Sequence, residues 1–221
     1  GGMAWVANGY LAAAVSGGGG LGLIGSGSMT ADHLRKEIAL VKSLTNKPFG
    51  VNLMMMNPAV ADLAQLCIDE KVPVITTGAG NPGQYIPAWK QAGSKVIPVV
   101  PSVALALRMQ RAGADALVAE GAEAGGHIGE LTTFCLIPQV ADAIEIPLIA
   151  AGGIADGRGV VAALMLGADA VQLGTAFICS TECTAHQTYK DMILEAGDTS
   201  TVVTGRGLGH PARSLKSKFI R

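Results

Sequence analysis

The sequence has little charge and no long apolar run, and both shortages exclude classes of protein. Only 15% of its 221 residues are charged and 49% are hydrophobic, so the chain is not expected to be disordered. The net charge is −1 and no basic run occurs, so neither nucleic acid nor an anionic membrane surface is an expected partner. No stretch of about 20 residues lacks charge, proline and turn glycines, which predicts no transmembrane helix.

Cysteine is scarce as well, with four residues at positions 67, 135, 179 and 183. They form no CxxC pair and have no histidine at zinc-like spacing, so no metal site is predicted. Cys179 and Cys183 are four residues apart and would share a face if their segment were helical. No secretory signal is visible, and we therefore expect reduced core thiols in a cytoplasmic protein.

The chain alternates between short apolar runs and amphipathic stretches. Continuous apolar runs are typical of strands buried on both faces, as in parallel sheets. The seven runs are residues 21–25, 49–53, 74–77, 95–100, 116–120, 147–151 and 170–174. The clearest helical stretches between them are residues 32–44, 58–71, 102–112 and 157–166. This alternation predicts an α/β protein built from βα units.

The same pattern favours a (β/α)8 barrel over an open doubly wound sheet. An internal echo, AGAD at 112–115 and LGAD at 166–169, marks the end of a helix and the next strand twice. A further helix-like stretch, residues 5–15, precedes the first run, so we expect an eighth strand ahead of it to be missing. The predicted division is a barrel with strands two to eight at residues 1–196, and the start of a further C-terminal segment at 197–221.

In such barrels the active site lies in the loops after the strands, with phosphate bound after strands seven and eight. Those two loops carry Gly152-Gly153 and Gly174-Thr175. Glycine lets backbone amides approach an anion closely, and Thr175 adds a hydroxyl donor. The alternative is that these glycines only form tight turns.

Polar residues mark other strand ends. Asn52, Glu120 and Gln172 interrupt or end apolar runs, and buried polar groups need partners, which are either a ligand or neighbouring strand ends. His127 follows a strand inside a glycine-rich loop. An imidazole there is a candidate general acid or, alternatively, an ordinary exposed loop histidine.

These residues belong to longer motifs that resemble the FMN-dependent nitronate monooxygenase family. The motifs lie at residues 1–4, 49–52, 76–82, 120–127, 151–157 and 172–175. Within that family, residues 99–104, 125–129, 204–206 and 209–211 are most similar to the flavin-dependent enoyl-acyl carrier protein reductases of bacterial type II fatty acid synthesis. Relative to the family, a first strand and a C-terminal segment are absent, which agrees with the missing strand expected above.

The resemblance implies FMN as cofactor and assigns it a set of residues. Gly2, Met3 and Ala4 would lie against the flavin, Asn52 would bond its ring or ribityl edge, and Gln172 would lie beneath it. Gly152, Gly153, Gly174 and Thr175 would hold the phosphate, which matches the backbone reasoning. The remaining implied cofactor contacts are Glu120, Gly125 and Ala151, and His127 matches the active-site histidine.

The activity implied is NADH- or NADPH-dependent reduction of the trans-2 double bond of an enoyl-acyl carrier protein, by a homodimer when the protein is full length. The alternative within the family is oxidation of alkyl nitronates with FMN and O2. Two other classes stay open from the residues alone, a non-enzymatic flavin- or phosphate-ligand-binding protein and a phosphosugar isomerase or synthase on the same barrel.

Overall fold

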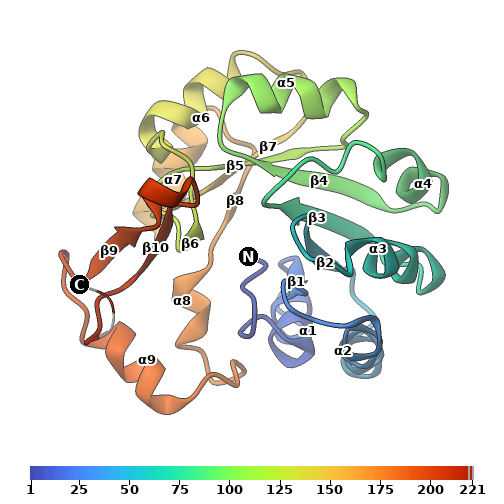
Figure 1. Cartoon of the computed structure of the whole chain (residues 1–221), viewed down its shortest axis with the longest axis horizontal. Coiled ribbons are helices and arrows are strands. Elements are labelled where there is room, and N and C mark those ends of the chain that lie inside the picture. The colour runs from blue at the N-terminus through green and yellow to red at the C-terminus, as the bar shows by residue number, and fades with distance from the viewer. Residues whose placement is uncertain (219, 221) are drawn as a thin grey trace. The chain divides into compact units, whose positions relative to one another are not determined.

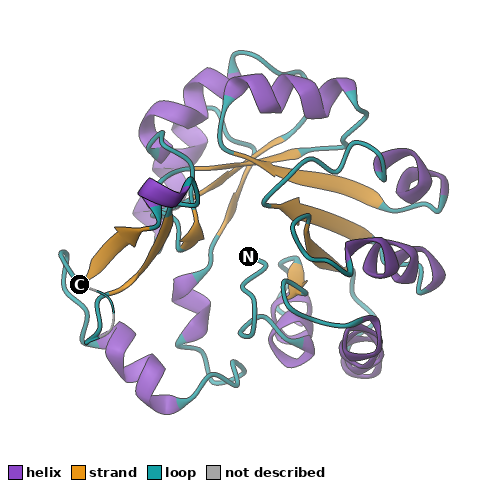
Figure 2. Ribbon diagram, in the orientation of Figure 1, coloured by secondary structure: helices purple, strands orange, loops and turns teal. Residues whose placement is uncertain are grey.

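The computed structural model describes residues 1–218 and 220. Strands and helices alternate along most of this chain (Figures 1 and 2). The strands are β1 (Gly22–Gly25), β2 (Phe49–Met54), β3 (Val74–Gly78), β4 (Lys95–Val100), β5 (Leu117–Glu120), β6 (Gly126–His127), β7 (Leu148–Ala151), β8 (Ala170–Gln172), β9 (Thr201–Thr204) and β10 (Ala212–Leu215). The helices are α1 (Gly9–Gly17), α2 (Ala31–Leu44), α3 (Val60–Asp69), α4 (Ile86–Gln91), α5 (Val103–Arg111), α6 (Thr133–Ala141), α7 (Gly157–Met165), α8 (Thr175–Ile178) and α9 (Gln187–Leu194), with a 3-10 turn at Arg206–Leu208.

Seven strands form one sheet in the order β1-β2-β3-β4-β5-β7-β8, which is their order along the chain. The pairs β1–β2, β2–β3, β3–β4 and β7–β8 are parallel. Parallel neighbours need a crossover, and a helix supplies it between these successive strands. The predicted fold class is confirmed. The chain is α/β, and its strand order is the order found in a (β/α)8 barrel, with one strand fewer.

The chain divides into two compact units. The first holds residues 1–99, 108–117 and 181–184, and the second holds residues 100–107, 118–180 and those from 185 onward. The first unit thus contains β1 to β3 and nearly all of β4, with α1 to α4. The second contains most of β5, all of β7 and β8, and the strands β6, β9 and β10.

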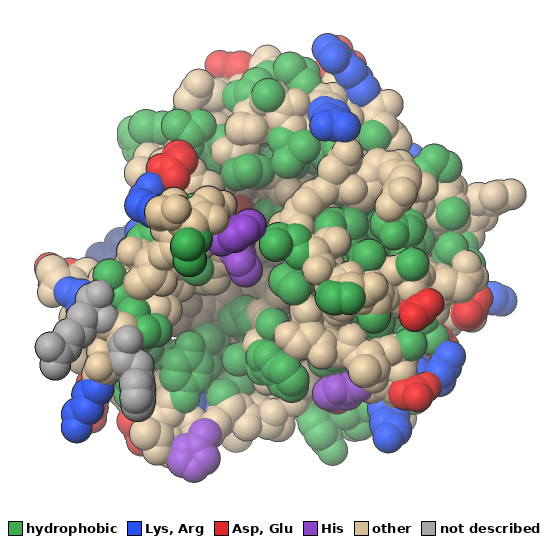
Figure 3. All heavy atoms as spheres, viewed as in Figure 1, with side chains coloured by type: hydrophobic (Ala, Val, Ile, Leu, Met, Phe, Trp, Pro, Cys, Tyr) green, Lys and Arg blue, Asp and Glu red, His purple; other side chains and the backbone are tan. Residues whose placement is uncertain are grey.

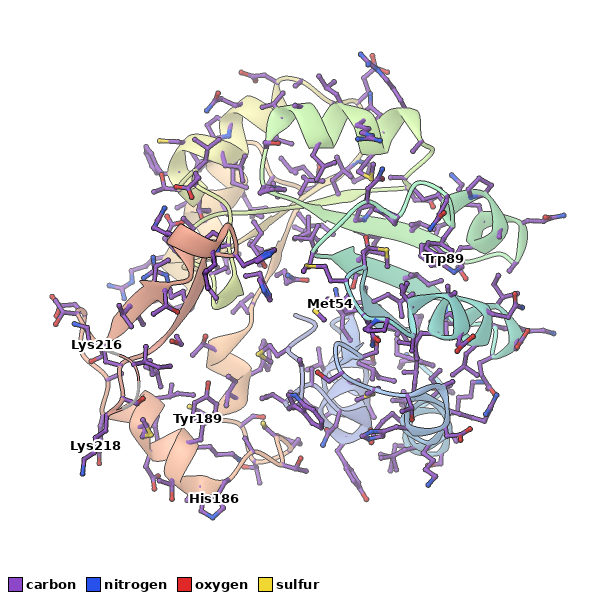
Figure 4. The ribbon with its side chains drawn as sticks, in the orientation of Figure 1. Met54, Trp89, His186, Tyr189, Lys216 and Lys218 are labelled. Atoms are coloured by element: carbon purple, nitrogen blue, oxygen red, sulfur yellow. The ribbon has the colours of Figure 1, made fainter. Side chains whose placement is uncertain are left out.

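The core of the first unit follows the predicted periodicity. Leu34, Ile38 and Val41 share one face of α2 and are fully buried. Trp89 of α4, labelled in Figure 4, is also fully buried, and its Nε1 donates to the carbonyl of Ala64 at 3.2 Å. The indole thereby fills a large volume while its one polar atom stays paired.

The AGAD/LGAD echo has a common structural role in both copies. Asp115 accepts a hydrogen bond from the amide of Val96 at 2.9 Å, and Asp169 accepts one from the amide of Leu148 at 2.8 Å. Each aspartate therefore joins the end of a helix to the start of a neighbouring strand. Burial raises the pKa of Asp115, but the bonds from Val96 and Lys95 and the charges of Lys90 and Lys95 outweigh it, so the net pKa is lowered.

The structure differs from three local expectations. The stretch 5–15 is not helical from its start, because Trp5 has φ +65° in an exposed turn and α1 begins at Gly9. Cys179 and Cys183 do not share a helix face, since α8 ends at Ile178. The glycine-rich segment after β5, expected to be a loop throughout, contributes β6 to a separate antiparallel sheet of order β6-β10-β9 (Figure 1).

Candidate functional site

In the first unit, residues 2–3 lie against the carboxyl ends of β1 and β2. A Cβ added to Gly2 would sit 2.2 Å from Cβ of Asn52, and one added to Gly25 would sit 2.5 Å from the carbonyl oxygen of Met3. Only glycine permits both approaches. The structure therefore brings together the four residues predicted here, since a Cβ on Gly27 would likewise lie 3.1 Å from that of Ala4.

Asn52 is half-buried at this end of β2 and is held by its neighbours on both sides. Its Nδ2 donates to Oγ1 of Thr76, its register partner on β3, at 2.9 Å. Its backbone carbonyl accepts a hydrogen bond from the hydroxyl of Ser26 at 2.7 Å. The bond to Thr76 orients the side-chain amide of Asn52, which adjoins residues 2–3. Met54, labelled in Figure 4, ends the same strand and is half-buried.

In the second unit, the predicted residues come from neighbouring strand ends. The amide of Gly121, just after β5, donates to the carbonyl of Ala151 at the end of β7 at 2.9 Å. Ala151 is in turn the register partner of Gln172 at the end of β8. Glu120, Ala151 and Gln172 are therefore consecutive across this edge of the sheet, with the loops that follow them at the same end.

The turns after β7 and β8 start side by side, because they follow the paired residues Ala151 and Gln172. Gly152 and Gly153 have φ values of +102° and +70°, a region that favours glycine. Gly153 and Thr175 are exposed and Gly152 is half-buried. We name residues 152–153 and 174–175 the glycine turns. They offer accessible backbone and one hydroxyl group to a ligand.

The nearby N-terminus of α7 is already capped. Asp156 accepts from the amides of Arg158 and Gly159, at 2.9 and 3.3 Å, and from the guanidinium of Arg158 at 2.6 Å. The bond from the Arg158 side chain, with those two backbone bonds, lowers the pKa of Asp156 to about 2. A carboxylate at this position disfavours an anion on the helix end, so an anion would have to be held by the glycine turns themselves.

Two residues that sequence reasoning gave no role support the turn after β7. Both carboxylate oxygens of Glu123 accept from the amide of Thr133, at 3.0 and 2.8 Å. The hydroxyl of Thr133 lies 2.9 Å from the carbonyl of Gly152 and 3.0 Å from Glu123 Oε2. A Cβ on Gly121 would lie 2.1 Å from that hydroxyl, so the cluster is closely packed. Glu123 lies within the 120–127 motif, but Thr133 had no signal in the sequence.

Glu120 and His127 carry the titratable groups of this edge. Burial raises the pKa of Glu120 to about 7. His127 is exposed in β6, paired with Ala212 of β10.

On the face shown in Figure 3, acidic and basic side chains are interspersed. Within residues 1–218 no group of three metal-ligating side chains is placed to hold an ion, and none of the helices described is long and apolar enough to cross a bilayer.

Comparison with known proteins shows the family of the chain. The chain matches the nitronate monooxygenase family over residues 1–67 and 63–221, and it belongs to that family. It is 57% identical to FabK from Thermotoga maritima, an enoyl-acyl carrier protein reductase, with a TM-score of 0.99 over 100% of this chain and 71% of that one. Its homologues are oxidoreductases.

Two sequence relatives show the range of the family. The chain is 41% identical over 99% of its length to a 5-hydroxy-7a-methyl-1-oxo-octahydro-1H-indene-4-carboxyl-CoA dehydrogenase of Mycobacterium tuberculosis, and covers 62% of it. It is 38% identical over 99% of its length to a probable nitronate monooxygenase of Staphylococcus saprophyticus, and covers 75% of it. The chain thus spans about three fifths of the length of that dehydrogenase.

Proposed function

We propose that this protein is an FMN-dependent enoyl-acyl carrier protein reductase that uses NADH or NADPH. The observation that carries the proposal is the 57% identity and TM-score of 0.99 to FabK over the whole chain. The identity to the probable nitronate monooxygenase is lower, at 38%. The Mycobacterium tuberculosis relative is named for a CoA thioester, which also favours a thioester as the substrate class.

The residues present fit a flavin mononucleotide. Accessible glycine turns at the ends of two adjacent parallel strands suit a phosphate group bound by amides, with Thr175 as a side-chain donor. Asn52, held by Thr76, presents an amide suited to an imide-bearing ring, with Gly2 and Met3 beside it. Glu120, Gly125, Ala151 and Gln172 are assigned to the same cofactor, as is Ala4.

When bound, FMN would supply the redox chemistry of the reaction. The overall change is NAD(P)H plus a proton plus a 2-enoyl thioester giving NAD(P)⁺ and the saturated thioester. The protein's own contribution is to orient the ligands and to manage the proton. His127 is exposed on β6, within the glycine-rich segment, and we assign its imidazole the role of giving a proton to the substrate carbon or of polarising the thioester.

The test is anaerobic oxidation of NADH by crotonyl thioester, using protein reconstituted with FMN. We expect turnover in the parent protein and a loss of about 100-fold or more in His127→Ala, since a general acid contributes about that factor. His33→Ala is the matched control, because His33 is exposed on α2 and, among the described residues, its side chain pairs only with Glu37. Unchanged turnover in His127→Ala would remove this histidine from the mechanism.

The second candidate is nitronate monooxygenase activity, which the family match itself favours. It predicts oxygen-dependent loss of an alkyl nitronate without any need for NADH. A protein that consumes nitronate in air but leaves NADH untouched in the presence of crotonyl thioester would reverse our assignment.

A further inference from the structure

The position of His127 depends on residues far away along the chain. The strand β6 has only two residues, and its partner is β10, where Ala212 pairs with His127 and Arg213 with Gly126. Just after it, the amide of Ile128 donates to the carbonyl of Pro211 at 3.1 Å. Residues 201–215, which we name the β9–β10 hairpin, therefore hold the histidine strand on its downstream side (Figure 1).

The two glycines directly before His127 make no packing contacts that would hold it. An added Cβ would meet no atom within 4 Å at either Gly125 or Gly126, so neither residue packs against the protein there. Gly126 also has φ +79°. Glycines without packing leave many backbone conformations accessible. The histidine can keep one orientation only if other groups anchor this segment.

Arg213 provides such an anchor on the upstream side. Its Nε donates to the carbonyl of Ala122 at 3.0 Å, and its second guanidinium nitrogen donates to Oγ1 of Thr201 on β9 at 2.9 Å. The side chain is half-buried and connects the loop to both strands of the hairpin. A guanidinium suits this task because its donors are rigidly spaced. The ion pair of Arg206 with Glu130 also joins hairpin and loop, but both side chains are largely exposed, so it contributes little.

We propose that Arg213 is a positioning residue for His127, acting through the Ala122 carbonyl and the β6–β10 pairing. The inference rests on the proposed function for the role of the histidine, but the anchoring itself does not. Removing the guanidinium would take away one of two bonds at Ala122, whose amide still donates to the carbonyl of Leu131 at 2.8 Å, while the hairpin still pairs with β6. The imidazole would then sample orientations away from the substrate, and misplacement of a catalytic group by about 1 Å costs on the order of 100-fold.

The experiment compares Arg213→Gln with Lys216→Gln. Both remove one positive charge from the same region, but Lys216 is exposed and, within the part of the chain that the structure describes, is bonded only through its backbone amide, to Ser200. With FMN-loaded protein, stopped-flow absorbance follows the loss of flavin colour on adding NADH and its recovery on adding crotonyl thioester. We expect Arg213→Gln to slow recovery by about 10- to 100-fold and to leave the first step unchanged, with Lys216→Gln like the parent.

A second measurement needs no cofactor. Hydrogen–deuterium exchange of the peptide covering residues 121–131 should increase in Arg213→Gln, while that covering residues 49–54 stays as in the parent. Thr201→Val removes only the hydroxyl that accepts from the Arg213 guanidinium, so it should increase exchange at residues 121–131 by a smaller amount. This variant replaces Arg213→Gln in the test if Arg213→Gln does not fold.

The outcomes separate the two proposals. If the parent protein shows no recovery with thioester, the proposed function fails, and exchange alone then decides whether Arg213 holds the loop. Unchanged exchange at residues 121–131 in both variants would overturn the inference, as would equal slowing of both absorbance steps.

Discussion

The carboxyl group of Glu120 ends strand β5 in surroundings that disfavour its charge. Burial raises its pKa from 4.5 to about 7. A carboxyl whose pKa is higher in the folded state binds its proton more tightly there, so folding stability falls as the pH rises from about 4.5 to 7 and stays reduced above that. Each pKa unit corresponds to about 1.4 kcal/mol, so the total penalty at pH 8 is about 3 kcal/mol.

Glu120→Gln should remove this penalty. Urea unfolding without added flavin should show the variant about 2–3 kcal/mol more stable than the parent at pH 8, and about 1 kcal/mol or less at pH 5. Glu195→Gln, at an exposed position after α9, is the control and should show no such pH dependence. A gain of equal size at both pH values would mean that the effect comes from packing rather than from ionisation.

At the scale of single residues, the sequence predicted site residues that are polar and lie within apolar runs. Asn52 stood out because an amide inside an apolar run needs partners, and it has Thr76. Arg213 and Thr133 gave no such signal. Arg213 contacts Ala122 across 91 positions, and Thr133 contacts Gly152 across 19, so only the folded chain brings each pair together.

At the scale of elements, α8 follows directly from the turn at Gly174 and is held by α9. Lys190 of α9 is 9% exposed, and its Nζ donates to the carbonyl of Ser180 at 2.7 Å, just beyond the end of α8. Replacing it by methionine keeps the volume and removes this bond. We expect Lys190→Met to lower the free energy of unfolding by about 1–3 kcal/mol, since the carbonyl loses a charged donor.

Because α8 begins at Thr175, the same variant should weaken FMN binding several-fold in a fluorescence titration. Lys47→Met, at an exposed loop position, should change neither quantity. Reduced stability with unaltered FMN affinity would show that Lys190 only supports the fold and does not reach the turn at Gly174.

The elements themselves were predictable to different degrees. All seven sheet strands were expected from their apolar runs, with ends that differ by at most two residues. In contrast, β6 has two residues, one of them glycine, and it exists because β10 pairs with it from more than 80 positions away. A strand of a single two-residue period shows no repeating pattern, so this element was missed although its histidine was singled out.

At the scale of the whole molecule, the predicted cofactor residues belong to both compact units. Gly2, Met3, Ala4 and Asn52 lie in the first, and the glycine turns lie in the second. A ligand bound by the folded chain raises its stability by mass action, by about 2.7 kcal/mol at 100 times the dissociation constant. For a chain of this size that corresponds to a rise in Tm of about 5–10 °C.

Comparing FMN with riboflavin isolates the phosphate, the group assigned to the glycine turns. We expect FMN to raise Tm by that amount and riboflavin, at equal concentration, to raise it by less than half as much, because the turns then have no anion to bind.

Gly153→Ala should remove most of this difference, since alanine at φ +70° must shift the turn. Gly93→Ala is the matched control, because Gly93 has φ +91° with open space around it and lies after α4. It should lower Tm through the same backbone strain yet keep the full preference for FMN. Equal responses to the two flavins in the parent protein would show that the turns after β7 and β8 bind no phosphate.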